Sequence, residues 1–151
     1  MKTPIPLDGF IQIAICVPDV EKALDAWCDL LGIQERPGIR ETSCEPKPAL
    51  DYRGTTPCYA QKMAVIPCRE RGFVLELMEV DENPSTFREF MNEHGVGVHH
   101  IGFQVGDKRD EVVAELKEKG YALRTEQQQG TWTIVDTEAR LGVNLNVKYK
   151  M

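Results

Sequence analysis

The chain has 151 residues, of which 42% are apolar and 28% are charged, and its formal net charge is −6. This length suits one domain, or two small modules that share a core. The net negative charge argues against a binding surface for nucleic acid or for an anionic membrane. The sequence has no run of about 18 apolar residues, and its N-terminus lacks the apolar stretch of a signal peptide. We therefore expect a cytoplasmic protein with no membrane span.

The cysteines are odd in number and show no Cys-x-x-Cys spacing, which argues against a disulfide framework and a zinc site. They are Cys16, Cys28, Cys44, Cys58 and Cys68. We expect reduced thiols that pack as small apolar side chains. Cys16 is an exception, because strand alternation places it on the same face as Gln12.

The first half of the chain predicts one strand, one helix and three more strands. Residues 10–17 alternate in polarity, which predicts a strand. Asp19 then predicts a helix N-cap, and Gly32 predicts the end of that helix. Its buried face is expected to comprise Val20, Leu24, Trp27 and Leu31. The further strands are predicted over residues 33–42, 58–67 and 72–80.

Two segments of the first half connect these elements. Residues 41–57 lack periodicity and contain three prolines, so we expect a long loop, a kind of segment that often covers a binding site. Residues 84–94 predict a short helix with Phe87, Phe90 and Met91 facing inward.

The second half follows the same order. It predicts a strand over residues 98–105, a helix that is capped by Asp107 and ends at Gly120, and strands over 121–127, 131–136 and 142–149. The buried face of this helix is expected to comprise Val112, Val113 and Leu116. The chain therefore contains two βαβββ modules, about residues 8–80 and 96–149, which predicts an α+β fold.

The two halves also match in sequence, which identifies equivalent polar residues. Residues 12–32 match 100–120, so that Gln12 corresponds to His100, and residues 72–76 match 142–146, so that Glu76 corresponds to Asn146. If the two modules enclose one cavity, these four side chains should converge in it. We expect the small residues Ala14 and Gly102 to leave room there for a ligand. His99 has the opposite strand parity and should point away from the cavity.

This organisation resembles the vicinal oxygen chelate superfamily, on the segments IQIAICVPDVEKALDAWCDLLGI and GVHHIGFQV. That superfamily includes glyoxalase I, extradiol dioxygenases, bleomycin-resistance proteins and methylmalonyl-CoA epimerase. The segment FVLELMEV, followed by a short helix and HGVGVHHIGFQV, is most similar to the epimerase branch. The resemblance covers nearly the whole chain. It implies paired modules that form a half-open barrel, and a homodimer.

The resemblance also implies a set of site residues. It places the four metal-ligand positions of the family at Gln12, Glu76, His100 and Asn146. The first three are acceptable ligands in the family, but Asn146 stands where the family has a glutamate that serves as ligand and base. The other base of the epimerase precedes a glutamine that looks like Gln61, which places Ala60 at that position. Both usual bases are therefore missing.

These substitutions bear on the chemistry. Glu76 is the only anion left among the four positions, so the affinity for a divalent cation should fall. We predict no required cofactor, and a weakly bound divalent metal on Gln12, Glu76 and His100 only if an ion is retained. Glu76 and His100 remain as a pair for proton transfer. Gln12 or Asn146 can donate a hydrogen bond to an enolate oxygen.

We therefore predict a racemase or epimerase that acts at a carbon α to a carbonyl. No clustered basic patch is expected at the cavity, so the favoured substrate is a small, apolar aromatic ketone, and dihydroisoflavones, which epimerase-like relatives racemise, are a concrete candidate. Predicted ligand contacts are Gln12, Asn146, Cys16, Met78, Tyr59 and Tyr52. Two alternatives remain open. One is a metal-dependent enzyme like methylmalonyl-CoA epimerase or glyoxalase, and the other is a non-catalytic binding protein of the bleomycin-resistance type.

Overall fold

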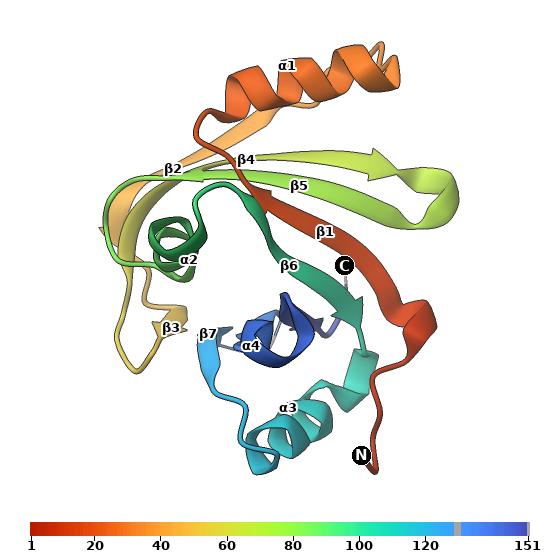
Figure 1. Cartoon of the computed structure of the whole chain (residues 1–151), viewed down its shortest axis with the longest axis vertical. Coiled ribbons are helices and arrows are strands. Elements are labelled where there is room, and N and C mark those ends of the chain that lie inside the picture. The colour runs from red at the N-terminus through yellow and green to blue at the C-terminus, as the bar shows by residue number, and fades with distance from the viewer. Residues whose placement is uncertain (129–130, 151) are drawn as a thin grey trace.

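The structure, a computed structural model, describes residues 1–128 and 131–150 (Figure 1). Within these ranges one sheet has the strand order β2-β4-β5-β1-β6-β9-β8-β7-β3. The strands are β1 (Phe10–Cys16), β2 (Ile39–Pro46), β3 (Leu50–Tyr52), β4 (Cys58–Cys68), β5 (Phe73–Val80), β6 (Gly97–Gln104), β7 (Leu123–Gln127), β8 (Thr133–Val135) and β9 (Asn144–Lys148). The helices are α1 (Val20–Leu31), α2 (Thr86–His94), α3 (Arg109–Glu118) and α4 (Glu138–Leu141). Short 3-10 turns are η1 (Leu7–Gly9), η2 (Arg69–Arg71) and η3 (Gly106–Lys108).

The two modules meet at the centre of the sheet, where β1 and β6 pair in antiparallel fashion. On either side of this pair, β1 runs parallel to β5 and β6 runs parallel to β9, so the two halves have the same local arrangement. Figure 1 shows the curved sheet lying between α1 and α3. This confirms the predicted α+β fold with paired modules in a half-barrel.

The strand β3 makes a long-range connection that the sequence did not predict. It belongs to the first half of the chain but pairs with β7 of the second half, at the far edge of the sheet, with Leu50 opposite Gln127. Residues 41–57, expected as a loop, therefore contain the end of β2 and all of β3. The prediction was wrong because β3 is short and gains its hydrogen bonds from a distant strand, which leaves no local periodicity to detect.

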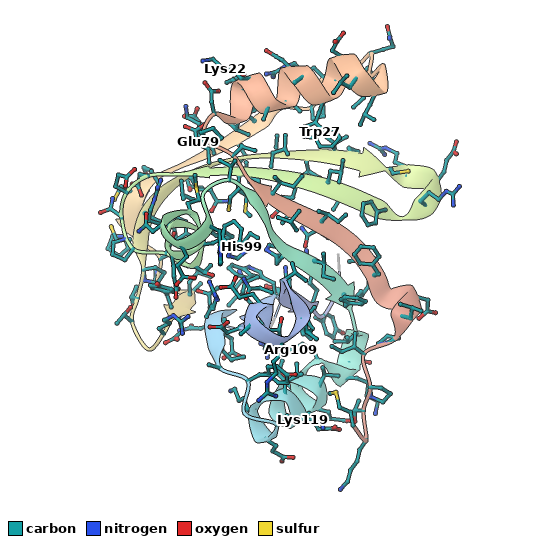
Figure 2. All side chains as sticks on the ribbon, in the orientation of Figure 1. Lys22, Trp27, Glu79, His99, Arg109 and Lys119 are labelled. Carbon is teal, nitrogen blue, oxygen red and sulfur yellow. The ribbon has the colours of Figure 1, made fainter. Side chains whose placement is uncertain are left out.

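Helix α1 has the caps that the sequence predicted. The Asp19 carboxylate accepts a hydrogen bond from the Lys22 backbone N–H at 3.1 Å, and Gly32 has the left-handed φ of 64°. The Glu79 carboxylate accepts a second hydrogen bond, from the Val20 backbone N–H at 2.8 Å, and Glu79 lies beside the start of the helix in Figure 2. These acceptors satisfy two of the free N–H groups in the first turn of the helix.

The buried face of α1 agrees with the prediction except at its end. Val20 and Leu24 are fully buried, Trp27 packs against the same cluster, and this cluster includes Leu75 and Leu77 of β5. Leu31 is 53% exposed, contrary to the prediction. Cys28 and Ile33 supply the apolar contacts at the end of the helix instead.

Helix α3 buries the residues that were predicted but starts differently. Val112, Val113 and Leu116 are buried against Val105, Val135 and Val147. Asp107, the predicted N-cap, lies in η3, and α3 starts at Arg109 without a side-chain cap. The 3-10 turn shifts the start of the helix by one residue relative to the sequence match with α1, in which Val20 corresponds to residue 108.

The other boundaries differ by a few residues. Strand β2 starts at Ile39 rather than at residue 33, because Pro37 lacks a backbone N–H for the ladder and adjoins Gly38. Helix α4 was not predicted, since a helix of one turn carries little periodic signal. In the ranges that the structure describes, no helix has the length and apolar character needed to cross a bilayer.

Candidate active site

A cavity of about 530 Å³ is lined by residues of both modules and by Phe87 of α2. The polar lining consists of Gln12, Arg40, Thr42, Lys47, Gln61, Glu76, His100, Gln127, Asn146 and Lys148. The remaining lining consists of Ala49, Leu50, Tyr59, Met63, Met78, Phe87 and Trp132. The convergence of many polar groups with apolar and aromatic side chains in one concave site is typical of a small-molecule site.

The four equivalent polar residues of the repeats lie together in this cavity. Gln12 Nε2 donates a hydrogen bond to Glu76 Oε2 at 2.9 Å, and Asn146 Nδ2 donates one to Gln12 Oε1 at 3.3 Å. The second hydrogen of Asn146 Nδ2 points to His100 Nε2 at 3.4 Å. Glu76, Gln12, Asn146 and His100 therefore form one hydrogen-bonded row, which we call the polar row. It spans strands β5, β1, β9 and β6, which places groups from both modules in contact.

Gly102 makes the position of Gln12 possible. The two residues are opposite each other across β1 and β6. A Cβ atom at Gly102 would lie 2.6 Å from Gln12 Oε1 and 2.9 Å from Gln12 Cβ. The space that we expected for a ligand is therefore filled by Gln12. Ala14, the other small residue, is fully buried in the cluster with Cys16, Met78 and Phe87.

The close approach at Gly102 gives a testable prediction. In Gly102→Ala the added methyl group displaces Gln12 and breaks its bonds to Glu76 and Asn146. We expect the free energy of unfolding to fall by about 1–3 kcal/mol, as for other overpacked sites. Urea denaturation measures this loss. A matched Gly38→Ala variant, whose Cβ would meet no atom within 4 Å, should stay close to wild type. Equal stability of the two variants would contradict the arrangement.

The Asn146 side chain presents hydrogen atoms to the row. The backbone N–H of Thr133 in β8 donates to Asn146 Oδ1 at 3.2 Å, which determines which end of the amide carries the oxygen. The Asn146 NH₂ group then faces Gln12 Oε1 and His100 Nε2, both acceptors. At the position where the resemblance described above implies a glutamate, this chain therefore has a neutral donor.

The protonation of the two histidines is assigned from the two contacts of His99 with Thr86. His99 Nε2 lies 3.0 Å from the Thr86 hydroxyl oxygen, which can donate or accept, and 3.2 Å from the Thr86 carbonyl oxygen, which can only accept. A hydrogen on Nε2 satisfies both contacts, so we place it there. Burial lowers the pKa of His99 to about 4, so this ring is neutral and its Nδ1 is an acceptor. His100 Nδ1, 2.8 Å away, must then be the donor. His100 Nε2 is left unprotonated and faces the cavity.

A β-bulge positions these adjacent histidines. The register between β1 and β6 shifts at this point, with Ala14 opposite His100 and Ile15 opposite Val98, which leaves His99 as the extra residue. Its ring packs on Phe87 of α2, with centroids 4.7 Å apart, and lies near α2 in Figure 2. His99 is therefore absent from the cavity wall, as its parity predicted, but it contacts His100.

The neutral histidines predict that mild acid destabilises the protein. The folded pKa of His99, about 4, is below the ordinary 6.5, so its contribution to stability is complete above pH 6.5 and is lost as the pH falls toward 4. At about 1.4 kcal/mol per pKa unit, the free energy of unfolding should fall by about 2 kcal/mol between pH 7 and pH 5 from His99 alone. Urea denaturation of His99→Gln should show a weaker pH dependence than wild type. Identical slopes for wild type and His99→Gln would contradict this account.

Glu76 is the acidic end of the polar row. Burial raises its pKa, while the charges of Lys148 and Arg40 and the bond from Gln12 oppose the shift. In His100, burial lowers the pKa well below 6.5. Both shifts favour the uncharged forms, a protonated Glu76 and a neutral His100. In its ionised form Glu76 is a stronger base than an exposed carboxylate.

Not all predicted contacts line the cavity. Met78 and Tyr59 do. Cys16 is fully buried behind the wall, and burial raises its pKa to about 12. Tyr52 donates to Glu89 at 2.9 Å outside the lining. Ala60, given above as the position of a missing base, does not line the cavity, whereas its neighbour Gln61 does.

Three cations in the cavity were not predicted from the sequence. Arg40, Lys47 and Lys148 line it, contrary to the expectation of no basic patch. Lys148 was detectable, because it follows Asn146 by two residues and therefore shares its strand face. Trp132 and Gln127 were also missed, since their segment has no counterpart in the sequence match.

The donor set does not fit a divalent cation well. Gln12 Oε1 and His100 Nε2 could be ligands, but the NH₂ of Asn146 lies between them and donates to both. Among the described residues that line the cavity, Glu76 is the only one with a carboxylate, whereas hard cations require several oxygen ligands. Elsewhere, Glu93, His94 and Glu138 bring three ligand atoms within 4.8 Å. Glu138 also bonds Arg124 at 2.6 Å, so this second group is an ion-pair network.

Comparisons with known proteins give a consistent result. A family model described as "Glyoxalase/Bleomycin resistance protein/Dioxygenase superfamily" matches residues 11–135. No curated protein matches the chain. A solved methylmalonyl-CoA epimerase from Mycobacterium tuberculosis is similar at a TM-score of 0.59 and 17% identity, covering 93% of this chain and 86% of that one.

Two other solved structures are equally similar. A hypothetical protein from Bacillus halodurans C-125 has a TM-score of 0.61 and 21% identity, with 94% of each chain covered. The Streptomyces coelicolor methylmalonyl-CoA epimerase in complex with 2-nitronate-propionyl-CoA has a TM-score of 0.58 and 20% identity, covering 91% of this chain and 94% of that one. At these identities the structural likeness concerns the fold.

Proposed function

The chain belongs to the glyoxalase/bleomycin resistance protein/dioxygenase superfamily, and we propose that it is a racemase or epimerase acting at a carbon α to a carbonyl. The observation that carries this proposal is the polar row, in which Glu76 and His100 lie at the two ends and the Asn146 NH₂ donor lies between them. Proton removal next to a carbonyl needs a base and a donor for the developing enolate oxygen. Similarity in fold to methylmalonyl-CoA epimerases also supports an isomerase.

The proposed reaction uses the two ends of the polar row in turn. A substrate carbonyl replaces the long contact of 3.4 Å between Asn146 and His100, and accepts the freed hydrogen from Asn146 Nδ2. His100 Nε2, now unpaired, takes the α-proton from one face, and the electron pair moves to the carbonyl oxygen. Protonated Glu76 returns a proton to the other face. The reverse reaction starts from ionised Glu76 and protonated His100.

The proposal also concerns the chemical identity of the substrate. Leu50, Phe87 and Trp132 in the cavity wall support an aromatic compound, and a dihydroisoflavone is the concrete candidate from the sequence. An uncharged ketone, however, would leave Lys148 and Arg40 without a partner. A homodimer and a cytoplasmic location are further proposals that rest on the family.

Two other functions each have one observation in their favour. A metal-dependent epimerase or glyoxalase-like enzyme is favoured by the convergence of Gln12, Glu76 and His100, which are ligand types of the family, although the Asn146 donor opposes it. A non-catalytic binding protein is favoured by the burial of His100, which is only 2% exposed and a weak base. We propose neither as the main function.

Deuterium exchange distinguishes these functions. The protein is incubated in D₂O with methylmalonyl-CoA, with dihydrodaidzein and with 3-phenyl-2-oxobutanoate, and exchange of the α-proton is followed by NMR. An isomerase exchanges at least one of them faster than the protein-free solution. Exchange that disappears on chelation favours the metal-dependent function. Tight binding of a compound without any exchange would overturn the proposal in favour of a binding protein.

A further inference from the structure

The cavity is positively charged although the whole chain carries a net charge of −6. Its wall contains Arg40, Lys47 and Lys148, against a single carboxylate, Glu76. In the part of the chain that the structure describes, ion pairs involve other cations, such as Arg109 with Glu126 at 2.6 Å, and none of these three. The concentration of unpaired cations in one concave site indicates a negatively charged ligand.

Lys148 is the most deeply placed of the three cations. It lies on β9, two residues beyond Asn146, and its side chain is half-buried in the cavity wall. Burial lowers the pKa of Lys148, and the charge of Glu76 opposes this shift. A desolvated ammonium group without a partner is unfavourable, and an anion that binds beside it offsets this cost.

The other two cations lie nearer the surface. Arg40 is exposed on β2, and among the side chains of the described residues its guanidinium bonds only the Met63 sulfur, at 4.0 Å. Lys47 follows β2, and its ammonium lies 4.8 Å from the centre of the Tyr59 ring. Both side chains therefore have hydrogen-bond donors free for a ligand.

We propose that the cavity is specific for a carbonyl compound that carries its own oxyanion, a carboxylate or a phosphate, held by Lys148 and Arg40. This inference rests on the proposed function, because it places the carbonyl oxygen at Asn146 and the reacting carbon between His100 and Glu76. The apolar residues Leu50, Phe87 and Trp132 then contact the uncharged part of the compound. The uncharged ketone favoured by the sequence is the less suitable ligand.

Binding of matched probes tests this specificity without any turnover. Phenylglyoxylate carries a carboxylate next to an aromatic ketone, and 1-phenyl-1,2-propanedione has nearly the same shape without charge. Phenyl phosphate tests the second oxyanion. Calorimetric titration of wild type should show that at least one anion binds about tenfold or more tightly than the dione, the range for a charge-assisted bond. Added NaCl should weaken the anion but not the dione.

Variants show whether the named cations are responsible. Lys148→Met removes the charge while keeping a side chain of similar length, and Arg40→Met does the same at an exposed position where folding is not at risk. Each should reduce anion affinity by about tenfold and leave dione affinity unchanged. Lys62→Met is the matched control, because Lys62 lies outside this cavity and pairs with Glu41.

The possible results separate this inference from the proposed function. Anion preference that is lost in both cavity variants but kept in the control supports it, and the preferred probe identifies carboxylate or phosphate. Equal affinity for anions and dione, or an anion preference that neither variant changes, overturns it. If the protein catalyses deuterium exchange on neutral ketones but shows no preference for anions, the proposed function stands and the specificity inferred here is wrong. A protein that prefers anions but catalyses no deuterium exchange would support the anion site and refute the proposed function.

Discussion

Replacement of Glu76 by glutamine is expected to lower the rate of racemisation by about 10³-fold, within the range for loss of a general acid–base group. Glutamine keeps the shape of the side chain, and its oxygen can still accept the bond from Gln12 Nε2. What is lost is the ability to release and take up a proton. The measurement is the loss of optical rotation of whichever panel compound exchanges fastest.

The pH dependence of this rate adds a second readout. Burial raises the pKa of Glu76 above 4.5, so the rate in wild type should change at a pH above that of an ordinary carboxylate, and Glu76→Gln should lack this change. Glu41→Gln, on the exposed part of β2, is the control and should behave as wild type. A Glu76→Gln variant that retains more than about a tenth of the wild-type rate would show that Glu76 does not transfer the proton.

Asn146→Asp is expected to make the site depend on a metal for its stability. The introduced carboxylate has nearly the same shape as the native amide, and one of its oxygens can still accept a hydrogen bond from the Thr133 N–H. Its second oxygen, however, faces two acceptors, Gln12 Oε1 and His100 Nε2. An unpaired buried charge of this kind should lower the free energy of unfolding by about 3 kcal/mol.

A divalent cation should reverse this loss. With two carboxylates, Gln12 Oε1 and His100 Nε2, the variant has the ligand set that wild type lacks. Urea denaturation with Mn²⁺ and with chelator should therefore differ strongly in Asn146→Asp and little in wild type. Stabilisation of wild type by Mn²⁺ as large as that of the variant would contradict the assignment of Asn146 as a donor.

Strand alternation and internal repetition predicted the centre of the site. Because Gln12, Glu76, His100 and Asn146 occupy equivalent positions in two similar modules, pairing of those modules had to bring them together. Their hydrogen-bond directions were not predictable, since these depend on Thr133 and Thr86, which are distant in the sequence. We interpreted the small residue Gly102 as space for a ligand, but the side chain of Gln12, which lies opposite it across β1 and β6, fills that space.

The errors share a physical cause in long-range structure. Strand β3 pairs with β7, and its three residues carry no periodic pattern of their own. The prediction for His99 was correct in direction, but its contact with His100 at 2.8 Å was missed, because the bulge that permits it depends on the register of β1 against β6. Leu31 was placed on the buried face by its spacing, but the contacts at the end of α1 come from Cys28 and Ile33.

The most direct test of the account is α-proton exchange by protein that has been exhaustively chelated and shown by elemental analysis to be free of metal. The Asn146 donor occupies the place of a metal ligand, so we expect the chelated protein to exchange its substrate at the rate of the untreated protein. Loss of exchange on chelation, with recovery on addition of a divalent cation, would contradict the account. It would mean that the Asn146 amide turns to present its oxygen and that the protein is a metal-dependent member of its family.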